Sequence, residues 1–192
     1  DIKGYTLVST NGNTTGTYID GTIEVTYIYY RETGEIDGDT ISKTGTNKVE
    51  KVTDEFNYEI KYSTTIKNYI GDATVTIVDT LPLPIDEAKS DLNGGKYEYK
   101  DGVATITWTE NIKGIDTNTN GNKLIEITKN IKVTYIGLEA TTREITNSVI
   151  GTIKTDVSEE KTDEIEKTTS VQVKGTVTAH YVNTTGATIA PD

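Results

Sequence analysis

The chain has 192 residues with no cysteine, no methionine and a single histidine, and its formal net charge is −11. The missing cysteines exclude disulfides and thiolate metal sites. The acidic balance argues against nucleic acid and anionic membranes as partners, because both attract basic surfaces. No apolar run is long enough for a signal peptide or a membrane-spanning helix, so membrane insertion is not expected.

The composition predicts an all-β protein. Hydrophobic residues make up 33% of the chain, and 12 tyrosines with many valines and isoleucines supply core material. β-branched residues and tyrosine favour strands, and no long apolar stripe of helical period is present. Short strands joined by tight turns are therefore expected. The chain begins with Asp1 and not with methionine, which indicates a fragment or a processed segment.

The first segment, residues 1–33, holds two runs of alternating apolar residues separated by the polar turn signal NGNTTG. Residues 2–30 resemble the C-terminal half of the mucin-binding repeat of Gram-positive surface proteins. That repeat carries a G-Y-x-L-V segment, a G-T-Y/F segment and a closing V-T-Y-V-Y strand. The resemblance implies a partial, β-rich segment of the ubiquitin-like β-grasp type.

A polar linker is predicted at residues 31–38, and the central domain is placed at residues 36–173. Alternating apolar runs bounded by turn signals predict its strands. These cover residues 39–45, 57–62, 73–80, 96–99, 103–110, 124–135, 144–154 and 168–181, with one helical turn within 86–92 and a solvated acidic connection at 156–166. The Asp-Gly pair at 101–102 predicts a hairpin turn, Pro82 ends a strand, and Trp108 is expected in the core.

Asp79 lies in phase with the core residues of its strand. Val75, Ile77 and Asp79 alternate with polar residues, so all three share one face. A carboxylate among core residues is costly unless it is paired or protonated. Lys43 and Asn147 occupy apolar-phase positions of an early and a late strand in the same way.

The central domain resembles bacterial surface-repeat domains related to A-type collagen-adhesin modules. The matching motifs are SKTG at 42–45, NYEIKY at 57–62, VDTLP at 78–82, ITW at 106–108 and ITNSV at 145–149. The resemblance implies an Ig-like or prealbumin-like β-sandwich. Members of that group often carry an autocatalytic Lys–Asn isopeptide bond promoted by a nearby acid. Matched by motif, this implies a cross-link between Lys43 and Asn147, with Asp79 as the acid.

The chemistry of this trio is reasonable without the resemblance. Burial drives a lysine toward its neutral, nucleophilic amine and an aspartate toward its protonated form, which can polarise an amide carbonyl. No cofactor is needed, because the fold aligns the groups. The alternative is structural: Asp79 caps the turn before Pro82, Lys43 extends to solvent, and Asn147 bonds the backbone.

Other lysines fit the reactive role less well. Lys61 is out of phase with its apolar neighbours, and Lys48 and Lys51 lie in a loop-like stretch, so all three are expected in solvent. Lys129 is in phase with the core of its strand, which indicates a bulge or an edge strand. Lys43 remains the best candidate.

A second motif, Asp116-x-Asn118-x-Asn120-Gly, matches the first half of an EF-hand calcium loop. The match then fails, because Ile127 stands where the bidentate glutamate is required. A polar hairpin loop is the preferred interpretation, and weak Ca²⁺ binding is the alternative. The single histidine, His180, is expected on a strand surface.

The last segment, residues 174–192, resembles the start of another mucin-binding repeat through GTVTAHYVNTTGATIAPD. The two end segments could pair within one chain or between neighbouring molecules, head to tail, since an open strand edge invites pairing.

Together these features predict a structural and adhesive segment of an extracellular, Gram-positive cell-surface protein, anchored to the cell wall through regions outside this chain. The alternative is a module that binds a host glycoprotein, mucin or another glycan through exposed tyrosines such as Tyr29, Tyr30 and Tyr69. An enzyme that acts on an external substrate is not expected, and the only predicted chemistry is a single self-cross-linking event.

Overall fold

The computed structural model describes residues 2, 5–17, 20–31, 34–51, 53–138, 142–172 and 184–185. The regular elements of the described chain are almost all strands, so the predicted all-β class is confirmed. The strands are β1 (Tyr5–Asn11), β2 (Thr26–Arg31), β3 (Glu35–Gly45), β4 (Lys48–Val49), β5 (Phe56–Lys67), β6 (Ile70–Leu81), β7 (Lys96–Lys100), β8 (Val103–Asp116), β9 (Lys123–Val133), β10 (Thr142–Lys154), β11 (Glu159–Lys161) and β12 (Ile165–Gln172). Two short helical turns, η1 (Glu87–Lys89) and α1 (Thr117–Asn120), complete the described elements.

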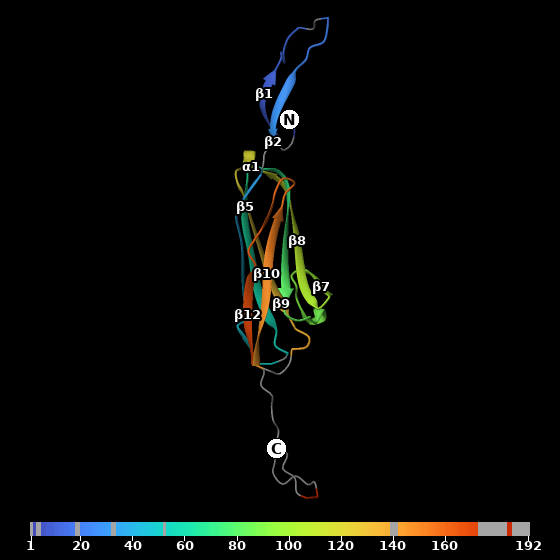
Figure 1. Ribbon diagram of the computed structural model, residues 1–192, viewed down its shortest axis with the longest axis vertical. Coiled ribbons are helices and arrows are strands. Elements are labelled where there is room, and N and C mark those ends of the chain that lie inside the picture. The colour runs from blue at the N-terminus through green and yellow to red at the C-terminus, as the bar shows by residue number, and fades with distance from the viewer. Residues whose placement is uncertain are drawn as a thin grey trace.

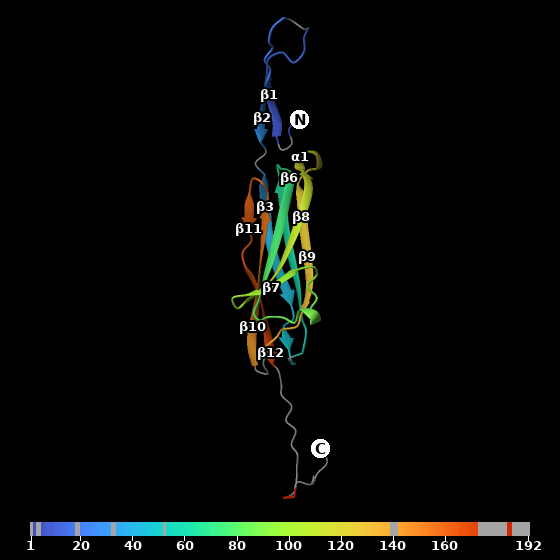
Figure 2. The same ribbon diagram turned by 90° about the vertical axis from the view of Figure 1, so that its right-hand side faces the viewer.

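Two facing sheets form an elongated β-sandwich (Figures 1 and 2). The larger sheet has the strand order β4-β12-β10-β6-β8-β7, and β11 also pairs with β10. The smaller sheet has the order β3-β5-β9. Strands β1 and β2 form a separate antiparallel hairpin.

The core lies between the two sheets and follows the period of the strands. Every second residue of β5 from Phe56 to Ile66 is buried, and so is every second residue of β6 from Ala73 to Leu81. Because alternate strand residues share a face, these two strands each present one continuous buried row. Any polar residue in phase with these rows is therefore forced into the interior.

The turn chemistry follows the sequence closely. Asp101 and Gly102 have φ angles of 52° and 83°, the left-handed values that a two-residue hairpin turn between β7 and β8 requires. Strand β6 ends at Leu81, directly before Pro82. Trp108 is 2% exposed, and its Nε1 donates to the carbonyl oxygen of Leu92 at 2.9 Å.

The chain enters and leaves the sandwich at opposite poles (Figure 1). At the hairpin pole, the N–H of Gly34 donates to Asn68 O at 3.0 Å, and Glu35 pairs with Lys67. At the far pole, Gln172 at the end of β12 pairs with Thr142 at the start of β10. Strands β3 and β12 therefore run in the same direction along the long axis.

Several strand boundaries differ from the sequence prediction, and two strands begin inside stretches that were predicted as linkers. β3 begins at Glu35, inside the predicted linker, because Ile36 packs against the core and pairs with Ile66. β12 begins at Ile165, inside the acidic stretch predicted as a solvated connection, because Ile165 pairs with Val149 and packs against the core. In both places a single isoleucine within a polar run is enough to extend the sheet.

Candidate functional site

The three residues singled out from the sequence meet in the interior. Lys43 lies on β3 in the smaller sheet, opposite Ile60 of β5. Asp79 lies on β6 in the larger sheet, between Ile106 of β8 and Val149 of β10. Asp79 and Asn147 are 0% exposed, and the Lys43 side chain has no exposed surface. The structural alternative, in which Lys43 extends to solvent, does not describe this arrangement.

Asp79 contacts both of its partners, one with each carboxyl oxygen. Lys43 Nζ donates to Asp79 Oδ1 across the gap between the two sheets. Asn147, on β10, donates from Nδ2 to Asp79 Oδ2 at 3.3 Å. The carboxyl group therefore lies between a lysine amine and an asparagine amide, each supplied by a different strand.

One atom of the site is left without a partner. Asn147 Oδ1 is buried and accepts no hydrogen bond. A buried, unpaired carbonyl oxygen costs about 1–3 kcal/mol, and native structures hold few of them. The carbonyl oxygen of the amide is thus the one polar atom of the trio that is buried without a hydrogen bond.

Burial shifts the proton equilibria of the pair toward its neutral form. The pKa of Lys43 falls from 10.5 to about 8, because removal of water from the ammonium outweighs its attraction to Asp79. The pKa of Asp79 rises, because burial of the carboxylate outweighs the effects of Lys43 and of Asn147. Both shifts bring the two groups closer to an uncharged amine beside a protonated acid.

Aromatic residues that sequence reasoning did not assign to the site enclose it. Lys43 Nζ lies 4.8 Å from the centre of the Tyr58 ring. The hydroxyl groups of Tyr58 and Tyr135 are 3.3 Å apart, and the Phe56 ring packs edge-on against Tyr135 with centroids 4.7 Å apart. The alternation that buries Tyr58 on β5 was visible in the sequence, but its position over Lys43 depends on the pairing of β3 with β5.

Lys48 and Lys61 are exposed as predicted, although Lys48 belongs to the short strand β4 and not to a loop. The side chains of Lys48 and Lys61 are 47% and 58% exposed. Lys129 lies on β9, an edge strand of the smaller sheet whose register with β5 is continuous, so the edge prediction is confirmed and no bulge is present. Its Nζ binds Glu110 Oε1 at 2.6 Å.

The predicted calcium loop contains a turn of helix. Asp116 caps α1: its Oδ1 accepts from the N–H of Thr119 and its Oδ2 from the Thr119 hydroxyl, both at 3.0 Å. Asn118 and Asn120 lie within α1 and are exposed. No group of three or more acidic or histidine side chains in the described residues could hold a metal ion, and weak Ca²⁺ binding here stays a prediction.

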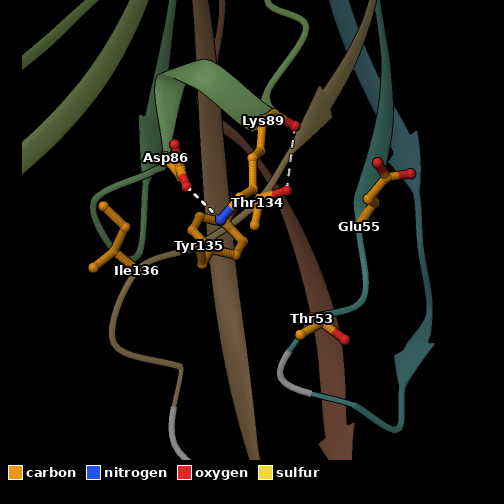
Figure 3. Close-up of a pocket in the computed structure, with 7 residues that line it drawn as sticks. All are labelled: Thr53, Glu55, Asp86, Lys89, Thr134, Tyr135 and Ile136. Atoms are coloured by element: carbon orange, nitrogen blue, oxygen red, sulfur yellow. Dashed lines mark hydrogen bonds and ion pairs between the residues drawn. The ribbon is translucent and has the colours of Figure 1, made fainter.

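A pocket of about 630 Å³, lined mostly by polar residues, lies beside η1 (Figure 3). Its lining is Thr53, Glu55, Asp86, Lys89, Thr134, Tyr135 and Ile136. Several of its charges are already paired, since Lys89 binds Asp86 at 2.9 Å and Glu55 binds Lys132 at 3.1 Å.

The tyrosines expected at a glycan-binding surface do not all reach it. Tyr30 is 53% exposed, but Tyr69 is 2% exposed, so the sequence prediction was wrong for Tyr69. Its ring packs against Gly71, and its hydroxyl donates to Asp72 O at 2.7 Å. His180 lies outside the described residues, and none of the described helices is long and apolar enough to cross a membrane.

No protein-family model and no curated protein matches the chain. Solved structures with a partly similar arrangement include BcpA, the major pilin subunit of Bacillus cereus, with 20% identity over 88% of this chain and 51% of that chain and a TM-score of 0.36. AggA, the major subunit of aggregative adherence fimbriae type I from Escherichia coli, matches with 13% identity over 73% of this chain and 96% of that chain and a TM-score of 0.34. AvmM, described as catalysing macrocyclization in alchivemycin A biosynthesis, matches with 8% identity over 74% of this chain and 92% of that chain and a TM-score of 0.36.

This chain thus spans about half of the pilin subunit that it matches. TM-scores this low do not establish a shared fold, and the functions of these proteins do not transfer to this chain.

Proposed function

We propose that the sandwich is a self-cross-linking structural module, in which Lys43 and Asn147 join through an isopeptide bond and Asp79 acts as the acid. One observation carries the proposal: an amine, a carboxyl group and an amide from three strands meet in a site that has no exposed surface. Three buried polar groups without a task would be a large liability. The chemistry of the trio gives them one.

The reaction balances within the protein. The neutral amine of Lys43 attacks Cγ of Asn147, a new N–C bond forms, and the bond between Cγ and Nδ2 breaks. Asp79 donates its proton toward the amide oxygen as negative charge develops there and takes it back when the carbonyl re-forms, and one proton of the amine leaves with the departing nitrogen. The products are an amide that joins β3 to β10 and one molecule of ammonia.

The starting protonation state needs no exchange with solvent. Lys43 and Asp79 together hold one proton to share when they are written as an ion pair, and transfer of that proton along their hydrogen bond gives the neutral amine and the neutral acid. The opposite pKa shifts of the two groups favour this transfer. Burial thus creates both the nucleophile and the acid at once.

The amide of Asn147 needs one adjustment for this role. In the structure its nitrogen faces Asp79 and its oxygen has no partner. A half-turn about the Cβ–Cγ bond exchanges the two atoms and brings the oxygen to the carboxyl group, where a protonated Asp79 donates to it. This orientation pairs the orphaned oxygen and polarises the carbonyl for attack.

We further propose that the module serves as a stalk-like, adhesive segment of a Gram-positive cell-surface protein outside the cell. Support comes from the resemblance of the sequence motifs, the absence of cysteine and the elongated sandwich whose chain ends lie at opposite poles. The cross-link takes the place of disulfides in a chain that can form none. The reaction occurs once per molecule, so the module is not an enzyme in the turnover sense.

Intact-protein mass spectrometry tests the cross-link. We expect the folded chain to weigh less than its sequence by the mass of one ammonia, and a peptide digest to contain Lys43 joined to Asn147. Asp79→Ala retains both reacting groups but lacks the acid, so it should keep the full mass. Lys129→Ala is the matched lysine control and should lose ammonia normally. A wild-type chain at full sequence mass would overturn the proposal.

A second function, binding of a glycan or host glycoprotein, is favoured by the polar pocket of Figure 3, whose carboxylates and threonines suit sugar hydroxyls. A glycan array with the wild-type chain and with Glu55→Ala tests it. Glu98→Ala, an exposed glutamate on β7, is the control. Binding lost only in Glu55→Ala would support this function, and no binding by the wild type would exclude it.

A further inference from the structure

Most of the exposed large hydrophobic residues of the described chain lie in the hairpin and the residues next to it. Twelve large hydrophobic residues are exposed among the described residues, and eight of them lie between residues 2 and 30. These eight are Ile2, Tyr5, Leu7, Val8, Ile23, Tyr27, Ile28 and Tyr30. The other four are dispersed over the sandwich. Apolar side chains concentrated on one small element mark an interaction site.

Both faces of this hairpin carry exposed apolar side chains, and no other described strand pairs with its edges. Tyr27 and Ile28 are consecutive residues of β2 and so point to opposite faces, yet they are 51% and 43% exposed. Within the described part of the chain, β1 and β2 pair only with each other. A lone two-stranded hairpin is marginally stable in water, and a third strand or a packed face is normally required. The outer edges of β1 and β2, with which no other described strand pairs, offer backbone groups for such a strand.

The chain itself contains a segment with the right chemistry. In residues 176–182, Val177, Ala179 and Tyr181 alternate with polar residues, as in a strand that buries one face. Residues 174–192 carry only Lys174 and Asp192 as charged groups, so their formal charge is zero apart from His180. The segment therefore escapes the repulsion that an overall charge of −11 would otherwise impose on two copies.

This segment cannot reach the hairpin of its own molecule. β12 ends at Gln172, at the pole remote from the hairpin. β10 alone, with 13 residues, spans about 40 Å of the sandwich between the two poles. The five residues from Gln172 to Val177 extend at most about 17 Å. The segment can reach the hairpin of a second copy, because that hairpin can lie next to the far pole.

We propose that residues 176–182 of one copy add as a strand to the β1–β2 hairpin of a second copy, so that copies join head to tail. The contact is heterologous: one surface at each pole, and each copy uses both. Such contacts produce open chains of copies, unless the rotation from one copy to the next closes them into a ring. The proposal stands independently of the Lys43–Asn147 bond, which lies inside the sandwich.

Sedimentation velocity on the full chain over a concentration series tests the assembly. We expect species larger than the 21.0 kDa monomer, and their share should rise with concentration. Leu7→Asp blocks the hairpin and Val177→Asp blocks the added strand, so each variant alone should sediment as a monomer. Leu124→Asp is the matched control, because Leu124 is 54% exposed on β9 of the sandwich, and it should assemble like the wild type.

Mixing the two blocked variants gives the decisive result. The strand of Leu7→Asp can still enter the hairpin of Val177→Asp, so the mixture should form a complex of two chains and nothing longer. A wild-type chain that is monomeric at every concentration overturns the proposal. So does self-association of Val177→Asp alone, which would show a hairpin-to-hairpin contact. The near-ultraviolet circular dichroism of buried Trp108 verifies that each variant retains a folded sandwich.

Discussion

Two lysine–carboxylate pairs bridge the two sheets of the sandwich, and their lysines lie at the same height along the smaller sheet. Lys43 on β3 and Lys129 on β9 both lie opposite Ile60, one on each side of β5. Lys43 contacts Asp79 of β6 with both side chains fully buried. Lys129 binds Glu110 of β8 with side chains that are 12% and 42% exposed. The groups are alike, and their access to water differs.

This comparison separates chemical identity from environment. At the open edge, water solvates the Lys129–Glu110 pair, and such a pair contributes at most about 1 kcal/mol to stability. In the interior, an ion pair of the same kind recovers its desolvation cost only with excellent geometry and further hydrogen bonds. Burial is therefore what converts an ordinary ion pair into a nucleophile beside an acid, and Asn147 supplies the group that they attack.

The largest expected effect follows from removal of the attacked amide. Asn147→Ala cannot form the cross-link, and loss of a covalent closure over roughly 100 residues lowers the free energy of unfolding by about 5 kcal/mol. For a chain of this size that corresponds to a fall of roughly 10–20 °C in melting temperature. Calorimetry on the variant measures it. Asn130→Ala, an exposed asparagine on β9, should melt like the wild type; equal melting of both variants would contradict the prediction.

The next largest effect compares the two lysine–carboxylate pairs in a chain that cannot form the cross-link. In the Asn147→Ala background, Asp79→Ala leaves Lys43 buried without a counter-charge and should cost about 3–5 kcal/mol. Glu110→Ala in the same background leaves Lys129 near solvent and should cost less than about 1 kcal/mol. Urea denaturation of both double variants gives the difference. Similar costs for the two would remove the distinction between interior and edge.

The pH dependence of bond formation gives a third effect. The reactive pair must hold one proton, and the pKa of about 8 at Lys43 marks the loss of that proton on the alkaline side. The rate of ammonia loss during refolding should therefore be constant just below pH 8 and fall about tenfold per pH unit above it. Time-resolved intact mass measures the rate. A rate that continues to rise above pH 9 would show that Asp79 is not needed as an acid.

The smallest effect concerns the edge pair alone. Lys129→Met should lower the free energy of unfolding by less than about 1 kcal/mol, and the loss should shrink further in high salt because exposed charges are screened. The variant should form the cross-link completely, which mass spectrometry verifies. If Lys129→Met failed to lose ammonia, the reactive lysine would be Lys129 at the edge and not Lys43 in the interior.

Much of the interior site was predictable from alternation. Asp79 had to lie inward because Val75 and Ile77 do, and the same period placed Lys43 and Asn147 on buried faces. That the three faces converge was a prediction of the motif resemblance alone. Alternation says which face a residue occupies, and it does not say which residue of another sheet lies opposite.

The features that sequence reasoning missed depend on contacts between residues that no local sequence pattern relates. The Lys129–Glu110 bridge requires β9 and β8 to lie at matching heights in different sheets, which no local pattern encodes. Tyr69 was predicted to be exposed, as one of the tyrosines that could stack on a sugar. It is buried because Gly71 has no side chain and so leaves room for the ring. The hydroxyl group is satisfied in the interior by a hydrogen bond to the carbonyl oxygen of Asp72.

The opposite placement of the chain ends has a mechanical consequence. Tension applied at Glu35 and Gln172 loads β3 and β12, which run in the same direction along the sandwich. With the proposed bond, the force passes from Lys43 directly to Asn147, and residues 44–146 lie outside the load path. An unlinked chain would release roughly 350 Å of slack from that stretch when it unfolds. The bonded module keeps that length folded, and so acts under load as a rod of fixed length rather than a spring.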